Sequence, residues 1–138
     1  PIVGGNKVAA SYGIIAGRTN LHSIWDGWLA ERAISTPPAG PAALLAQIPA
    51  SERERIAGGS VEDWSREMWV KARDLAYKTL LPDPCGDEPA ERPMLDEAEV
   101  RALIPAVREN VTAGGIRLAR LLDDALGPEA KAPGRRRP

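Results

Sequence analysis

The sequence has very few of the side chains that most often bind transition metals or act as nucleophiles. Its 138 residues include one histidine, His22, and one cysteine, Cys85. A lone cysteine excludes a disulfide within the chain, and a free thiol and a bond to a cysteine elsewhere both stay open. A catalytic zinc usually has three protein ligands, and carboxylates alone are an unusual zinc site. His22 therefore belongs to at most part of such a site.

Other classes of protein are excluded by composition. The chain has no phenylalanine, so its core must consist mainly of Leu, Ile, Val and Ala. No run of 18 apolar residues occurs, which excludes a membrane-spanning helix. The 18 basic and 19 acidic residues nearly cancel, so no overall field attracts nucleic acid, although bound metal ions would supply positive charge locally. The sequence also lacks a P-loop, a dinucleotide-binding glycine motif and a Ser–His or Cys–His pairing.

The one candidate for chemistry is the pair formed by His22 and Asp26. Thr19 and Asn20 are both residue types that favour a helix N-cap. In a helix that begins there, His22 and Asp26 share one face, with Cβ atoms about 5–6 Å apart. An imidazole and a carboxylate at this separation can share a zinc ion, whose bonds to them are about 2.0–2.2 Å long. The alternative is an ordinary helical Asp–His pair.

Apolar spacing and turn residues predict a mainly helical chain after a short N-terminal β segment. Ser51 with Glu54, and Ser60 with Asp63, have the types that cap helices. We expect a hairpin or irregular strand region within 4–19, an extended connector over 82–93, a disordered tail over 128–138, and helices over about 21–33, 41–48, 51–57, 61–80 and 96–126.

The last helix contains three residues that disfavour helices. Pro105 predicts a kink or a division into two helices. Gly114 and Gly115 each lower helix stability by about 1 kcal/mol relative to alanine. Close approach of a neighbouring helix is a reason for a helix to keep such residues, so we expect one there. Two apolar stripes are too long to be buried by a chain of this size, namely Val61-Trp64-Met68-Leu75 and Val107-Val111-Leu118-Leu122.

The order of motifs around the His–Asp pair resembles a known family. Gly-Gly-Asn at 4–6 precedes Gly-Arg-Thr-Asn-Leu-His at 17–22, which precedes Trp-Asp at 25–26. This order is similar to that of the S-one/P-one type single-strand-specific zinc nucleases, also called type I nucleases or 3′-nucleotidases. Their fold is shared with zinc-dependent phospholipase C. The resemblance implies a mainly α fold, with a helical body of this type and a short N-terminal β hairpin.

Two weaker matches extend the resemblance to about residues 4–123. Trp-Ser-Arg-Glu at 64–67 is similar to the family's Trp-Ala-x-Glu. The segment Gly-Ile-Arg-Leu-Ala-Arg-Leu-Leu-Asp at 115–123 is similar to its Gly-x-Arg-Leu-Ala-x-Leu-Leu-Asn.

The resemblance also implies an activity and residue roles. Such enzymes use a cluster of three zinc ions to hydrolyse single-stranded DNA, RNA and 3′-nucleotides to 5′-phosphate products, and are typically secreted or periplasmic. His22 and Asp26 match two ligands of one zinc. Gly27 and Trp28 match positions in a nucleobase pocket, and Asn20 is a motif position that either caps a helix or binds substrate. No residue of this chain matches a catalytic water-activating group.

The family's other zinc ligands have no match here. They include an N-terminal Trp and a His-x-x-Gly-Asp-x-His-Gln-Pro-Leu-His segment ahead of Gly-Gly-Asn. We therefore expect residues 1–127 to be the C-terminal, incomplete part of a single nuclease-like domain. This part would be inactive alone and would need the missing N-terminal half. The alternatives are a phospholipase C-like zinc phosphodiesterase and a non-catalytic helical interaction module.

Overall fold

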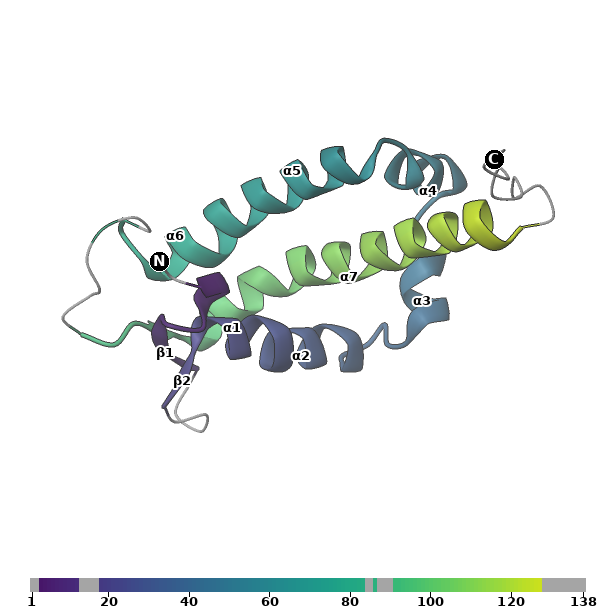
Figure 1. Cartoon of the computed structure of the whole chain (residues 1–138). Helices are drawn as coiled ribbons and strands as arrows, with labels where there is room; N and C mark the ends of the chain where they lie inside the picture. The colour runs from purple at the N-terminus through teal and green to yellow at the C-terminus, as the bar shows by residue number, and fades with distance from the viewer. Residues whose placement is uncertain (1–2, 13–17, 84–85, 87–90, 128–138) are drawn as a thin grey trace, which may run out of the picture.

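Most of the chain is helical, as Figure 1 shows. The computed structural model describes residues 3–12, 18–83, 86 and 91–127, so Cys85 and the predicted tail at 128–138 lie outside the described residues. In Figure 1 the long helix α7 lies between the segment α1–α2 and helix α5. The mainly α fold predicted from the sequence is confirmed. None of the helices in the described ranges is both long enough and apolar enough to cross a bilayer.

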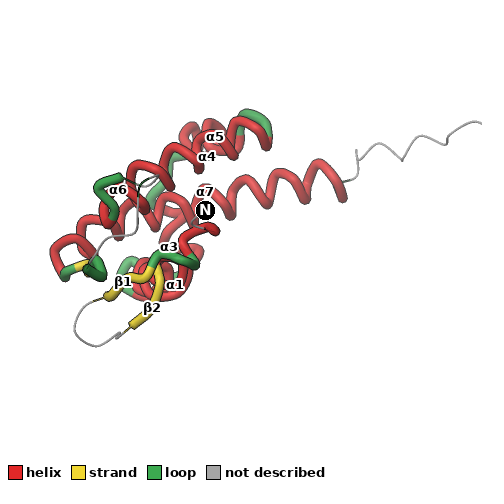
Figure 2. The backbone as a smooth tube through the Cα atoms, turned by 60° about the vertical axis from the view of Figure 1, so that its left-hand side comes forward, coloured by secondary structure: helices red, strands yellow, loops and turns green. Residues whose placement is uncertain are grey.

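A small sheet stands at one end of the molecule (Figures 1 and 2). A short 3₁₀ segment, η1 (Val3–Gly5), leads into β1 (Ala9–Tyr12), which pairs antiparallel with β2 (Arg18–Asn20) as the predicted hairpin. A third strand, β3 (Met94–Leu95), pairs parallel with β1. This pairing joins segments more than 80 residues apart, so local sequence patterns do not indicate it.

The first helical unit follows β2 without a break. It runs through α1 (Leu21–Ser23), a π-helical segment η2 (Ile24–Leu29) and α2 (Ala30–Ser35). Two short helices come next, α3 (Pro41–Ala46) and α4 (Ala50–Ala57).

The prediction that Ser51 caps the second of these short helices is wrong. Helix α4 starts one residue earlier, and the Pro49 carbonyl accepts hydrogen bonds from Glu52 N and Arg53 N at 3.0 Å. Proline fixes its own φ near the helical value, so the chain enters the helix at Pro49 and Ser51 falls inside it.

The second helical unit matches its predicted bounds of 61–80. It consists of α5 (Val61–Lys71), a second π-helical segment η3 (Ala72–Tyr77) and α6 (Lys78–Leu80). Ser60 and Asp63 form the predicted capping box, each side chain accepting the other's backbone N–H.

Helix α7 (Glu97–Leu126) is a single element of 30 residues with Pro105 inside it. Of the two outcomes expected at Pro105, the division into two helices is therefore wrong, and the kink stays a prediction. Pro105 is exposed. The expected close approach at Gly114 and Gly115 is also wrong, because a Cβ built on either residue would meet no atom within 4 Å among the described residues.

The core lies where the sheet, the first helical unit and the N-terminal half of α7 meet. Its fully buried side chains include Ile24, Leu29, Leu95 and Val100. The C-terminal half of α7 leaves large apolar side chains exposed, as expected for a stripe too long to be covered. These are Val111, Leu118, Leu121, Leu122 and Leu126.

Candidate metal site and adjoining cavity

The junction between β2 and α1 fixes the position of His22. Asn20 Oδ1 accepts a hydrogen bond from Ser23 N at 2.8 Å, which is the helix cap that the sequence predicts. Leu21 N donates to the Val8 carbonyl at 2.9 Å, and the Leu21 side chain is buried. His22 therefore projects from the first turn of α1. Backbone hydrogen bonds and the buried Leu21 side chain hold this turn in place.

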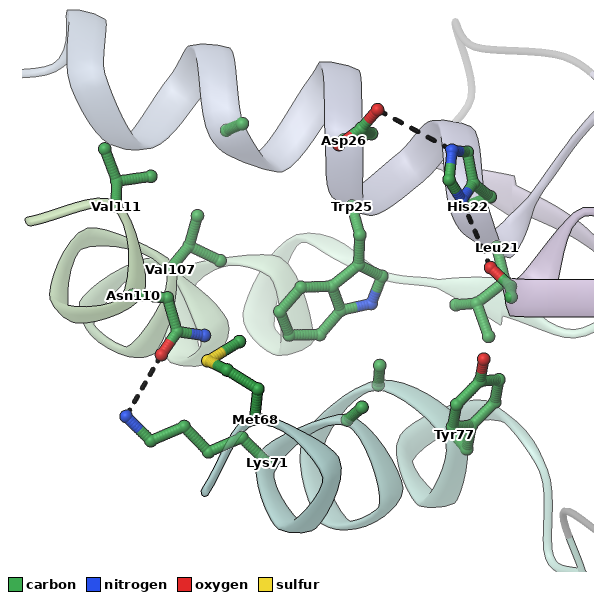
Figure 3. A pocket seen from close by; sticks show the side chains of 14 residues that line it. Leu21, His22, Trp25, Asp26, Met68, Lys71, Tyr77, Val107, Asn110 and Val111 are labelled. Carbon is green, nitrogen blue, oxygen red and sulfur yellow. Dashed lines mark hydrogen bonds and ion pairs between the residues drawn. The ribbon is translucent and has the colours of Figure 1, made fainter. Parts of the chain in front are cut away.

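The imidazole of His22 lies between a backbone carbonyl and a carboxylate (Figure 3). Its Nδ1 is 3.1 Å from the Gly4 carbonyl oxygen, and its Nε2 is 3.6 Å from Asp26 Oδ2. A carbonyl oxygen only accepts hydrogen bonds, so a hydrogen bond in this contact needs the ring proton on Nδ1. In the neutral ring this leaves a lone pair on Nε2, on the side that faces Asp26.

This donor pair fits a zinc ion. Two ligand atoms on a tetrahedral zinc, with bonds of about 2.0–2.2 Å, lie about 3.3–3.6 Å apart. The 3.6 Å between Nε2 and Oδ2 is at the upper end of that range and is too long for a hydrogen bond between the two side chains. The two side chains are 46% and 81% exposed, respectively, so an ion has free access to both.

The pair offers two possible metal ligands. Within the described ranges, no group of three or more His, Cys, Asp or Glu side chains is arranged to hold a metal ion. Two protein ligands are fewer than the three that a catalytic zinc usually has. The role of His22 and Asp26 as ligands of a metal therefore stays a prediction.

A cavity of about 320 Å³ adjoins the His–Asp pair. It lies between the first helical unit, the α5–η3 segment and α7, and Figure 3 shows Trp25, Met68 and Tyr77 around it. Trp25 is half-buried and packs against the core while also lining this cavity. Its other lining residues include Leu21, Ala30, Ala72, Ala76, Val107 and Val111.

One cation lines this mostly apolar cavity. Lys71 Nζ lies 2.8 Å from Glu109 Oε1, 3.0 Å from Glu67 Oε1 and 3.1 Å from Asn110 Oδ1. Burial alone would lower the pKa of Lys71, but the hydrogen bonds that its ammonium donates to Glu109 and Glu67 outweigh it and raise that pKa above its ordinary value. Sequence reasoning missed this residue, because two of its three partners, Glu109 and Asn110, come from a helix about 40 positions away.

The two weaker sequence motifs meet beside Lys71. Arg117 donates a hydrogen bond to Glu67, and its guanidinium carbon lies 5.3 Å from the centre of the Trp64 ring. The guanidinium carbon of Arg120 lies 5.4 Å from the same ring. This geometry allows cation–π attraction from both arginines. The motifs at 64–67 and 115–123 therefore join α5 to α7 through charged and aromatic contacts.

The predicted substrate residues lie apart from the cavity. The amide oxygen of Asn20 is used by the helix cap. Gly27 is exposed, and Trp28 is 43% exposed and does not line the cavity. Of the predicted site residues, the structure brings His22 and Asp26 together, and the binding roles of Asn20, Gly27 and Trp28 stay predictions.

Comparison with protein families identifies the chain. The profile of the S1/P1 nuclease family matches residues 2–127. The chain belongs to the S1/P1 nuclease family. Among curated proteins and among solved structures, no chain matches it. Membership of this family assigns the chain to the nucleases, a class of phosphodiesterase, and agrees with the mainly helical fold.

Proposed function

We propose that His22 and Asp26 are two ligands of one zinc ion in a nuclease centre that cleaves phosphodiester bonds. The substrates would be single-stranded DNA, RNA and 3′-nucleotides, and the products would carry 5′-phosphates. The observation that supports this proposal is the 3.6 Å separation of His22 Nε2 and Asp26 Oδ2, with Nδ1 turned to the Gly4 carbonyl. Bound zinc activates water and neutralises phosphate oxygens in such reactions.

Each residue has a distinct part in the proposal. The Gly4 carbonyl holds the His22 ring with Nδ1 turned toward it and Nε2 facing Asp26, which adds a negative charge next to Nε2. The remaining ligands of a three-zinc cluster, and the group that activates water, come from outside the described residues. By analogy with its family, the intact enzyme works after secretion or export to a periplasm.

Substrate binding is proposed for Trp28, Gly27 and Asn20. Trp28 keeps 43% of its surface exposed two residues after Asp26, so a base near the metal could stack on its indole ring. Such stacking contributes about 1–3 kcal/mol per base. Gly27 lies between Asp26 and Trp28, and a Cβ built on it would meet no described atom within 4 Å. The backbone at this position is therefore open to a substrate.

Metal content and turnover test the ligand assignment. In the protein with a complete centre, His22→Ala and Asp26→Ala should lower bound zinc and hydrolysis of a single-stranded oligonucleotide together, with unchanged helicity. Glu31→Ala, an exposed acidic position on the same helical unit, is the matched control and should leave both unchanged. A double variant of His22 and Asp26 with normal zinc content and normal turnover would refute the assignment.

The isolated 138-residue chain provides a second test. It should hydrolyse single-stranded DNA at no meaningful rate, because two ligands do not complete a catalytic zinc site. Turnover by the purified chain that is abolished both by a chelator and by His22→Ala would show that the proposed incomplete centre is wrong.

A further inference from the structure

We propose that the Gly4–Gly5 turn is a positioning element that sets the tautomer of His22. The turn aims the Gly4 carbonyl at Nδ1, so that the neutral ring carries its proton there and presents a bare Nε2. The importance of this tautomer for zinc rests on the proposed function, whereas the tautomer itself is a property of this chain alone.

The backbone of both glycines is in the left-handed region. Gly4 has φ 61° and Gly5 has φ 86°, values that L side chains rarely adopt. With the backbone in this conformation, the Gly4 carbonyl faces the first turn of α1. The 3.1 Å contact from this oxygen to His22 Nδ1 joins positions 18 residues apart.

Gly5 keeps the turn close to the helix because it has no side chain. It is buried, and a Cβ built on it would lie 3.1 Å from His22 N and 3.3 Å from Leu21 Cβ. Both atoms belong to the capped start of α1 and have little room to move. A side chain at position 5 therefore needs a shift of a few tenths of an ångström between η1 and the helix, in a backbone conformation that L residues rarely adopt. We expect this shift to weaken the contact between the Gly4 carbonyl and Nδ1.

The turn is also tied to the hairpin that supports the helix. The Gly5 carbonyl accepts from Val8 N at 3.1 Å, and the Val8 carbonyl accepts from Leu21 N at 2.9 Å. The next residue pairs in register, Ala9 with Asn20, and Asn20 caps the helix. The carbonyl and the imidazole are thus held by one continuous set of backbone hydrogen bonds.

This arrangement is the one that metal-binding histidines need. The nitrogen that does not bind the metal usually donates to a carbonyl or carboxylate, which fixes the ring and raises the basicity of the other nitrogen. Loss of such a partner typically lowers metal affinity by about 10–100-fold. We expect that effect on zinc affinity in the complete protein when the turn is displaced.

The experiment reads the tautomer directly. His22 is the only histidine, so tag-free, ¹⁵N-labelled protein gives one set of imidazole signals, measured at a pH where the ring is neutral. Wild type should be mainly protonated on Nδ1, and Gly5→Ala should lose this preference. Gly40→Ala is the matched control, with φ 83° and no described atom within 4 Å of a built Cβ, and should keep it.

A second pair of variants covers the case in which Gly5→Ala does not fold. A Cβ at Gly4 meets no described atom within 4 Å, so Gly4→Asn, which tolerates left-handed backbone, should retain the Nδ1–H tautomer. Gly4→Val should lose it, since a β-branched residue resists that backbone.

Protonation of the wild-type ring on Nε2 would overturn the inference, as would an unchanged tautomer in folded Gly5→Ala or Gly4→Val. A wild-type ring protonated on Nδ1 in a complete protein that binds no zinc through His22 would support the positioning role and refute the proposed function.

Discussion

At the scale of single residues, the sequence predicted the candidate metal-binding side chains. It did not predict the backbone group that contacts one of them. His22 and Asp26 were found because the spacing of four places both on one helical face, and the structure puts their nearest N and O atoms 3.6 Å apart. The Gly4 carbonyl was missed, because every residue has a carbonyl and only the fold decides where it points. Lys71 was missed for a similar reason, since its partners Glu109 and Asn110 lie on another helix.

Glu67 should make stability depend on pH. The Arg117 hydrogen bond lowers the pKa of Glu67 despite its partial burial, and Lys71 lowers it further. A lowered folded-state pKa adds stability above the unfolded-state pKa, and this is lost as pH falls through the folded value. Glu67→Gln should therefore reduce the free energy of unfolding at pH 7, and the difference from wild type should shrink as the pH falls below about 4.

Urea unfolding of both proteins, from pH 7 to the lowest pH at which they remain folded, measures this difference. Glu67 is 38% exposed, so solvent screening keeps the effect modest. Glu62→Gln, an exposed position on the same helix, serves as control and should show no such trend. A Glu67→Gln effect that stayed constant with pH would contradict the assigned ion pairs.

At the scale of helices and strands, the sequence predicted those features that depend on contacts between residues close in the chain. Asn20 caps α1 and Ser60 with Asp63 caps α5, because a cap joins groups within three residues. Ser51 was misassigned because Pro49 takes the N-cap position and the helix starts at Ala50. Strand β3 was not predicted because it exists only by pairing with β1. The two π-helical segments, η2 and η3, both line the 320 Å³ cavity, and no periodicity in the sequence marked them.

Replacing either of the paired glycines of α7 with alanine should increase the stability of the chain. A methyl group at Gly114 or Gly115 would meet no described atom within 4 Å, and both lie inside a helix. Gly114→Ala and Gly115→Ala should each raise the free energy of unfolding by about 1 kcal/mol, the difference in helix propensity. Chemical denaturation checks this, with Gly5→Ala as the contrasting variant that should lose stability. A loss in the α7 variants would mean that a partner packs against this face.

At the scale of the whole molecule, the chain leaves much apolar surface open. The predicted stripe on α7 is buried at Val107 but exposed by 42% at Val111, 56% at Leu118 and 48% at Leu122. Beside it a second, larger cavity of about 780 Å³ lies among α3, α4 and α7, lined mainly by apolar residues. The sequence indicated this outcome, because the apolar stripes were longer than the remaining elements could cover.

We expect the purified chain to associate through this surface, because apolar patches beyond a few hundred Å² usually mark association or aggregation. It should bind a hydrophobic dye and show a mass above that of a monomer in light scattering. The variant Leu118→Glu with Leu122→Glu should reduce dye binding and mass while leaving helicity intact, since both side chains are exposed. Ala98→Glu with Ala102→Glu places the same charges at the same spacing on exposed positions of α7 and should change neither. A monodisperse, cooperatively melting monomer without dye binding would show that this surface is stable in water, and would favour a self-contained helical module over a part of a larger nuclease domain.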